Sequence, residues 1–213
     1  MRRPAPDALR RRLLRPLPLL GVAGLLGACS LGNAPRSDFF LLHDAAGPGA
    51  PAGGPRIDQV LMVSAMAPPG LYDSDRMVFS ADGLSRSYFQ FGYWSERPAQ
   101  SLQTLAEARL AAAGRFRQVV SSTSGVRGDL LLSLRLDELY LDAARSPGQV
   151  WLSVSAELID WRDRKLLGRR SFRQSASVPR AGAPGLAEAA SQAMGALLGD
   201  LADWSAATAT ARP

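Results

Sequence analysis

Alternation of hydrophobic and polar residues predicts most of the strands in this chain. In residues 130–136, leucine occupies every even position, while Ser133 and Arg135 stand between them. At residues 137–138 the phase shifts, and the next apolar residues are Leu139 and Leu141, a change typical of a β-bulge. Residues 152–158 show the answering alternation, and residues 166–178 follow a turn at 162–164. Such half-apolar strands indicate an antiparallel sheet with one face on a core.

Shorter segments predict the remaining strands. They are residues 39–42 (FFLL), 57–67, 76–80, 87–91 and 116–120. Asp82-Gly83 lies between two of them and predicts a hairpin turn, and Pro68-Pro69 ends the strand at 57–67. Residues 44–55 (DAAGPGAPAGGP) have no periodic apolar pattern, so we expect a flexible segment there.

Two segments have the periodicity of amphipathic helices. The first has Ser95 as its expected N-cap and Pro98 in its first turn, and it ends at Gly114. The second places Leu186, Leu197 and other apolar residues up to Trp204 on one stripe. We therefore predict an α+β fold in the order ββββαββββα. It is a single domain with a mainly antiparallel sheet covered by two amphipathic helices, followed by a flexible tail at 207–213.

The N-terminus has the pattern of a secretory signal peptide. Residues 1–28 contain six arginines, one aspartate and an apolar run at 17–26. That run is too short to cross a hydrocarbon core of ~30 Å, which needs roughly 20 apolar residues. Basic, apolar and small residues in this order are typical of an exported protein. Gly27 and Ala28 then lead directly into Cys29, the only cysteine.

Leu26-Gly27-Ala28-Cys29 resembles the lipobox of bacterial lipoproteins. The resemblance implies cleavage between Ala28 and Cys29, a diacylglycerol on the thiol and a further acyl chain such as palmitate on the freed amine. Residues 1–28 would then be the signal peptide, 29–37 a lipidated tether and 38–206 the folded domain. Ser30, in place of Asp, implies sorting to the inner leaflet of the outer membrane, facing the periplasm. A buried structural thiol is the alternative, but it fits the adjacent signal-like segment poorly.

Most of the net positive charge of the chain lies in residues 1–28. The whole chain has a formal charge of +6, but the part from Cys29 onward has 19 basic and 18 acidic residues. This near balance gives no reason to expect a nucleic-acid partner. Without a second cysteine, the chain can form no internal disulfide.

The residues suited to catalysis are isolated. His43, the only histidine, is followed by Asp44, but no Gly-x-Ser-x-Gly elbow completes a triad, so we expect a surface histidine. Asp137 and Glu138 are adjacent in a strand and should point to opposite faces as solvated carboxylates. A bulge that brings the two carboxylates together is the alternative. We therefore expect no enzyme activity, no cofactor and no metal site. A periplasmic hydrolase dependent on His43 is the weakest alternative.

Several features together resemble the ABC-type transport auxiliary lipoprotein family, the PqiC-like proteins. They are the lipobox, the FFLL strand, the strand ending in Pro-Pro, residues 71–78 (LYDSDRMV) and residues 93–98 (YWSERP). The resemblance implies a non-catalytic subunit beside an ABC permease and an MCE-type (mammalian cell entry) substrate-binding protein. Such a set moves phospholipid or other lipids between inner and outer membranes. A structural or assembly lipoprotein of the envelope, with no transporter partner, is the alternative.

Residues 91–94 (FGYW) are more aromatic than the family pattern. Alternation puts Phe89, Phe91 and Tyr93 on one face, mostly in the core, and Trp94 should lock the following helix onto the sheet. Contact of Tyr93 and Trp94 with a partner or lipid is the alternative.

Overall fold

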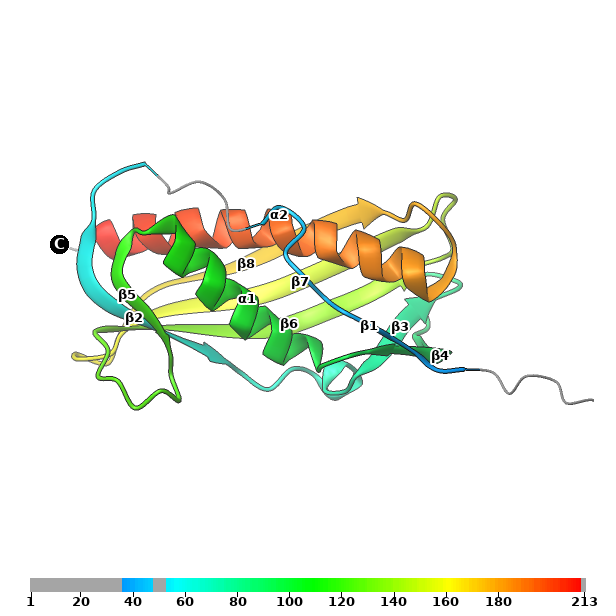
Figure 1. The fold of residues 1–213 in the computed structure, drawn as a ribbon, viewed down its shortest axis with the longest axis horizontal. Helices are drawn as coiled ribbons and strands as arrows, with labels where there is room; N and C mark the ends of the chain where they lie inside the picture. Colours follow the sequence, from blue (N-terminus) through cyan, green and yellow to red (C-terminus); the bar gives the residue numbers. More distant parts are fainter. Residues whose placement is uncertain (1–35, 48–52, 212–213) are drawn as a thin grey trace, which may run out of the picture. The chain divides into compact units, whose positions relative to one another are not determined.

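The computed structural model describes residues 36–47 and 53–211, and the residues from Ser37 onward form one unit. Its elements, in chain order, are β1 (Asp38–Phe40), β2 (Ile57–Ala65), the 3-10 turn η1 (Gly70–Tyr72), β3 (Arg76–Ser80), β4 (Ser87–Trp94), α1 (Pro98–Ala113), β5 (Phe116–Ser121), β6 (Leu130–Asp142), β7 (Gln149–Asp160), β8 (Lys165–Ser177) and α2 (Gly182–Thr210). The predicted α+β fold and the order of strands and helices are confirmed (Figure 1). Ala28 and Cys29 lie outside the described residues.

Strand β6 is the centre of a mixed eight-stranded sheet. Along one edge it pairs antiparallel with β7 over its whole length, and β7 pairs antiparallel with β8. The register shifts between Leu136 and Glu138, which confirms the predicted bulge. The long ladders of the sheet are therefore antiparallel, as the alternation predicts.

The other edge of β6 is shared by two strands that both run parallel to it. β2 pairs with the first half of β6, and β3 pairs with its end, through Phe79 and Ser80. Beyond β2 lies β5, in parallel, and beyond β3 lie β4 and then β1. Proline and η1 separate β2 from β3, so the chain leaves the sheet and returns further along the same edge.

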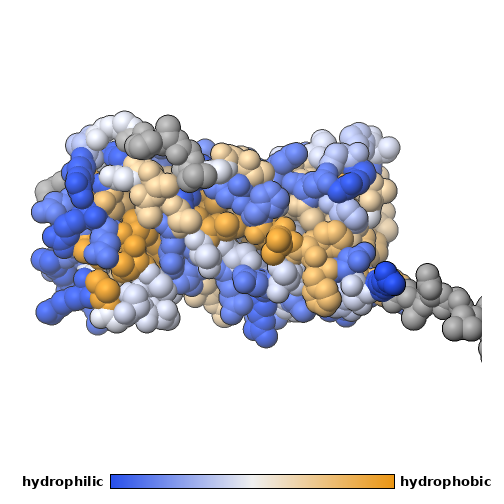
Figure 2. All heavy atoms as spheres, in the orientation of Figure 1, coloured by the Kyte–Doolittle hydropathy of each residue, from blue (hydrophilic) through white to orange (hydrophobic). Residues whose placement is uncertain are grey.

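Both helices cover one face of the sheet (Figure 1). α2 packs on β7 and β8, α1 packs on β2 and β5, and the helices contact each other. Fully buried side chains meet between these layers, including Leu132, Leu152, Leu197 and Leu201. Each such leucine contributes roughly 1.5–3 kcal/mol through burial. Figure 2 shows that apolar atoms remaining on the surface in this view form patches between hydrophilic side chains.

The helix boundaries differ from prediction at two points. α1 begins at Pro98 with Arg97 as its N-cap, so the predicted cap Ser95 is wrong. Strand β4 continues to Trp94, and the Ser95 N–H donates to the Phe40 carbonyl oxygen instead (2.8 Å). At the other end of α1, Gly114 has φ 65°, as a left-handed C-cap requires.

Helix α2 runs to Thr210, into the segment 207–213 that was predicted as a flexible tail. It continues because its last turns still pack on β8. A Cβ at Gly168 would lie 2.9 Å from Thr208 Cγ2 and 3.4 Å from the Trp204 ring. The missing side chain at Gly168 thus lets the helix approach the strand. No helix in the described ranges is long and apolar enough to cross a membrane.

The first residues of the predicted flexible segment 44–55 are fixed on the helices. Asp44 forms a two-point ion pair with Arg109 of α1, with Arg109 Nε donating to Oδ2 at 2.8 Å. The Ala45 N–H donates to the Ser191 carbonyl oxygen of α2 (3.4 Å). His43 is exposed, as predicted. Residues 41–47 therefore form a strap, which we call the N-terminal strap, across both helices.

Candidate functional site

Exposed aromatic side chains gather where β1 meets β4. Parallel pairing sets Phe39 opposite Tyr93, and their rings stack with centroids 5.6 Å apart at 29°. Phe39 is 66% exposed and Leu41, just after β1, is 72% exposed. Phe91 lies two residues before Tyr93 on the same strand and is also exposed. We call these four residues, Phe39, Leu41, Phe91 and Tyr93, the β1–β4 patch.

The alternation expected for β4 is wrong in one respect. Tyr88 and Phe89 pack against the core, and Phe89 contacts Phe79 with centroids 4.9 Å apart. Phe91 and Tyr93 do not belong to that core. The cause is a register shift between β3 and β4, which breaks the simple period of two between Tyr88 and Tyr93.

The two residues predicted as possible partner contacts are placed differently. Trp94 is 2% exposed and belongs to the core, and its backbone N–H donates to the Asp75 carbonyl oxygen (2.7 Å). Tyr93 is half-buried, and its hydroxyl donates to the Gln90 carbonyl oxygen (3.4 Å). A contact with another molecule through this segment therefore depends on Tyr93 and its neighbour Phe39, and it stays a prediction.

Two further features shape the β1–β4 patch. Within the described ranges β1 pairs only with β4, so its other backbone edge is open to an added strand. Gly92, between Phe91 and Tyr93, carries the start of α2 close above it: a Cβ there would lie 2.7 Å from Ala183 Cβ. The patch thus lies on the edge strand β1 and its neighbour β4, where β4 packs closely against the first turn of α2.

The sequence did not reveal Phe39 and Leu41 as surface residues. FFLL is an uninterrupted apolar run and predicts a strand buried on both faces. Only Phe40 and Leu42 pack inward. The signal available was the length of the run, since so short a strand beside a charged and glycine-rich stretch suits an edge.

The adjacent carboxylates Asp137 and Glu138 both lie on the sheet face without helices, beside Ser155 and Ser153 of β7, so the expectation that they point to opposite faces is wrong. The bulge between Leu136 and Glu138 places them on one face, where arginines bind both. Arg135 Nε donates to Asp137 Oδ1 at 2.7 Å, and the Ser155 hydroxyl donates to Oδ2 at 2.6 Å. Glu138 lies 3.8 Å from Arg173. These are partly exposed ion pairs rather than an acid and a base around a cleft. Among the described residues, no group of three or more His, Cys, Asp or Glu is placed to hold a metal.

Comparison with known proteins gives one family and one fold. The family model for the ABC-type transport auxiliary lipoprotein component matches residues 40–202. A crystal structure from Xanthomonas campestris, assigned to family DUF330, has a TM-score of 0.73 at 16% identity, covering 82% of this chain and 97% of its own. A second, an uncharacterized protein, has a TM-score of 0.62 at 14% identity, covering 80% and 99%. Curated proteins give no match.

Proposed function

This chain belongs to the ABC-type transport auxiliary lipoprotein family, and from that premise we propose that it is a non-catalytic auxiliary subunit of an MCE-type ABC transporter. The transporter would move phospholipid or other lipids between the inner and outer membranes. The observation that carries the proposal is the family match, which extends from the end of β1 to residue 202 within α2. The ion-paired carboxylates of the open sheet face support a role without catalysis.

The proposed attachment is through Cys29, at the inner leaflet of the outer membrane. Each buried methylene of an acyl chain adds ~0.8 kcal/mol, and a single chain holds only marginally. Two or three chains on Cys29 would therefore keep the domain at the membrane. The partner subunits, an ABC permease and an MCE-type protein, would come to it there.

The β1–β4 patch is the surface on which we propose that one of these partner subunits docks. Aromatic residues are enriched at protein interfaces, and Phe39 and Tyr93 already stack in one arrangement. The open edge of β1 adds backbone groups that a partner strand could use.

Crosslinking followed by purification tests this function. Lipoprotein recovered from crosslinked cells should bring MCE and permease subunits with it. Phe39→Glu should lower that recovery several-fold, because it places a charge at the centre of the β1–β4 patch. Leu84→Glu is the matched control, since Leu84 is almost fully exposed on the β3–β4 turn.

The outcomes separate two conclusions. Repeated recovery of the lipoprotein alone would reject the transporter role and leave an envelope lipoprotein without such partners. Recovery of the partners by both variants alike would keep the role and reject the β1–β4 patch as the docking surface.

A further inference from the structure

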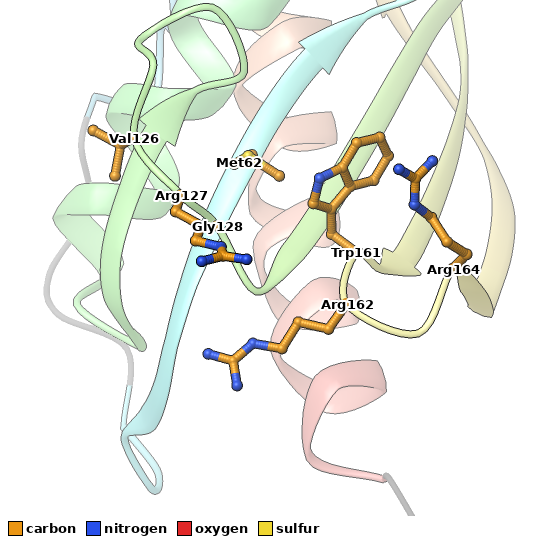
Figure 3. Close-up of a pocket in the computed structure, with 7 residues that line it drawn as sticks. All are labelled: Met62, Val126, Arg127, Gly128, Trp161, Arg162 and Arg164. Carbon is orange, nitrogen blue, oxygen red and sulfur yellow. The ribbon is translucent and has the colours of Figure 1, made fainter.

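A hollow of about 700 Å³ lies where β6 begins and where β7 turns into β8 (Figure 3). It is lined by Met62, Val126, Arg127, Gly128, Trp161, Arg162 and Arg164. In Figure 3, Met62 lies between Val126 on one side and Trp161 on the other. The volume is within the range of small-molecule sites in proteins.

The hollow is rich in guanidinium groups. Arg162 is bound by the buried Asp129, and Arg164 lies over the Trp161 ring, 4.5 Å from its centroid. Arg127 makes no hydrogen bond or ion pair with any described residue. Two carboxylates belong to the same turn: Asp163, and Asp160, which is buried and accepts hydrogen bonds from the backbone N–H groups of Arg162 and Asp163. The positive charge at the mouth is therefore carried by Arg127 and Arg164.

The backbone at Arg164 is unusual. Its φ is 56°, the one positive value at a non-glycine position in the described ranges. Glycine, asparagine or aspartate fit this conformation at lower cost. The residue at this position of the turn is nevertheless an arginine, and its guanidinium group lies over the Trp161 ring.

An apolar row runs beside the hollow across the sheet face without helices, and Met62 belongs to both. Strand pairing places Val120, Met62, Leu131, Ile159 and Leu166 opposite one another in turn, from β5 to β8. Directly opposed residues project on the same face. None of the five belongs to the core cluster beneath the helices. Met62 is only 6% exposed, Val120, Leu131 and Ile159 are half-buried, and Leu166 is 48% exposed, so the row is most accessible towards β8. Four spacings between strands give the row a length of roughly 19 Å.

On the side away from the hollow, the apolar row has a polar border. The next row on the same face is polar and consists of Ser64, Ser133, Glu157 and Arg169. Arg169 and Glu157 form an ion pair there (2.7 Å). At the hollow, Gly128 has no side chain where the Met62 side chain lies, so Met62 joins the hollow to the row.

We propose that the hollow and the apolar row together bind one phospholipid. Its phosphate binds to the guanidinium groups of Arg127 and Arg164, which lie on either side of Trp161 in Figure 3, because guanidinium groups bind phosphate oxygens in two-point contacts. One acyl chain follows the apolar row, and Trp161 lies between the polar and apolar parts, as its amphipathic ring favours. The choice of a lipid as the bearer of the phosphate rests on the proposed function, and the row explains why a free phosphate would use only part of the site.

Native mass spectrometry of the full chain, purified in a nonionic detergent, tests the site. The probes are dioctanoyl phosphatidylglycerol, dioctanoyl glycerol without phosphate, and inorganic phosphate. We expect one phosphatidylglycerol per chain in addition to any covalent anchor. The double variant Arg127→Gln with Arg164→Gln should weaken its binding by at least about tenfold. Leu166→Asp should weaken the binding of both dioctanoyl probes, because it places a charge in the apolar row.

Matched controls keep the test sharp. Arg173→Gln removes an arginine that lies over Trp151 (4.6 Å) on the same face, and it should bind as the unaltered chain does. Leu84→Asp is the matched control for Leu166→Asp, because Leu84 is exposed and lies outside the apolar row, and it should bind both probes as the unaltered chain does. Arg127→Gln alone removes an exposed side chain that makes no hydrogen bond or ion pair with a described residue, so it serves if the double variant fails to fold.

Two results would overturn the proposal. One is phosphatidylglycerol binding that neither the arginine variants nor Leu166→Asp change. The other is inorganic phosphate binding as tightly as the lipid, which would leave an anion site without a lipid. No transporter is present in this assay, so its failure is distinct from loss of the partners in crosslinked cells.

Discussion

At the scale of single residues, Asp129 shows how one buried carboxylate joins three segments. It accepts a hydrogen bond from the Val60 N–H of β2 (2.8 Å) and pairs with Arg117 of β5 (3.6 Å) and with Arg162 of the β7–β8 turn. Burial alone would raise the pKa of Asp129. The Val60 hydrogen bond and the charges of Arg162 and Arg117 outweigh it, so the pKa lies below its ordinary value.

This lowered pKa predicts how stability depends on pH. Above the unfolded pKa of about 3.9 the carboxylate contributes its full stabilisation, which is lost as the pH falls through the lower folded pKa. Asp129→Asn should therefore lower the free energy of unfolding by about 1–3 kcal/mol at pH 7 and flatten its decline in acid. Urea unfolding at several pH values measures both effects.

Asp58→Asn is the control for Asp129. Asp58 also pairs with Arg117 (3.4 Å), but its side chain is 87% exposed, so its loss should matter little. Equal losses in the two variants would contradict the role assigned to Asp129.

At the scale of elements, the Asp44–Arg109 pair fixes the N-terminal strap to α1. The two side chains are only 12% and 11% exposed. Removing one partner leaves the other charged and poorly solvated. Asp44→Asn should therefore lower the free energy of unfolding by about 3–5 kcal/mol. Replacing both, by Asp44→Asn with Arg109→Met, should cost less than the sum of the single changes. A double-mutant cycle by denaturant unfolding measures the difference, and simple additivity would show that the pair is not coupled.

Local patterns predicted the strands better than their partners. The alternation in β6 and β7 and the bulge after Leu136 depend on neighbouring residues, and both were predictable. The parallel pairing of β2 and β3 with β6 joins segments far apart in sequence, and no local pattern encodes it. The end of α2 likewise depends on contact with Gly168, about 40 residues away.

The candidate sites follow the same division. Tyr93 could be singled out because it stands in an aromatic run, whereas Phe39 was hidden in an apolar run. The hollow was not predictable, because β2, the loop before β6 and the turn after β7 each supply only a few of its residues. Its arginines look like ordinary surface charges until the fold brings them together.

At the scale of the whole molecule, the proposed lipid tether on Cys29 predicts where the protein is found. Cys29→Ser should leave the fold unchanged, since Cys29 precedes every described element, and should move the protein from the membrane to the soluble periplasmic fraction. Membrane fractionation with circular dichroism measures both, and Ser30→Ala should remain attached. Membrane attachment of the Cys29→Ser variant would contradict lipidation at this residue.

The strap also sets how the domain would respond to a pull. β1 contributes only three residue pairs with β4, whereas the ion pair at Asp44 lies deeper along the chain. Tension applied through the proposed tether at Cys29 would detach residues 38–43 first. This would release about 20 Å of extended chain while Asp44 remained paired with Arg109. The domain would then lengthen under load at its N-terminal end, with Leu42 leaving the core while the ion pair at Asp44 still joined the chain to α1.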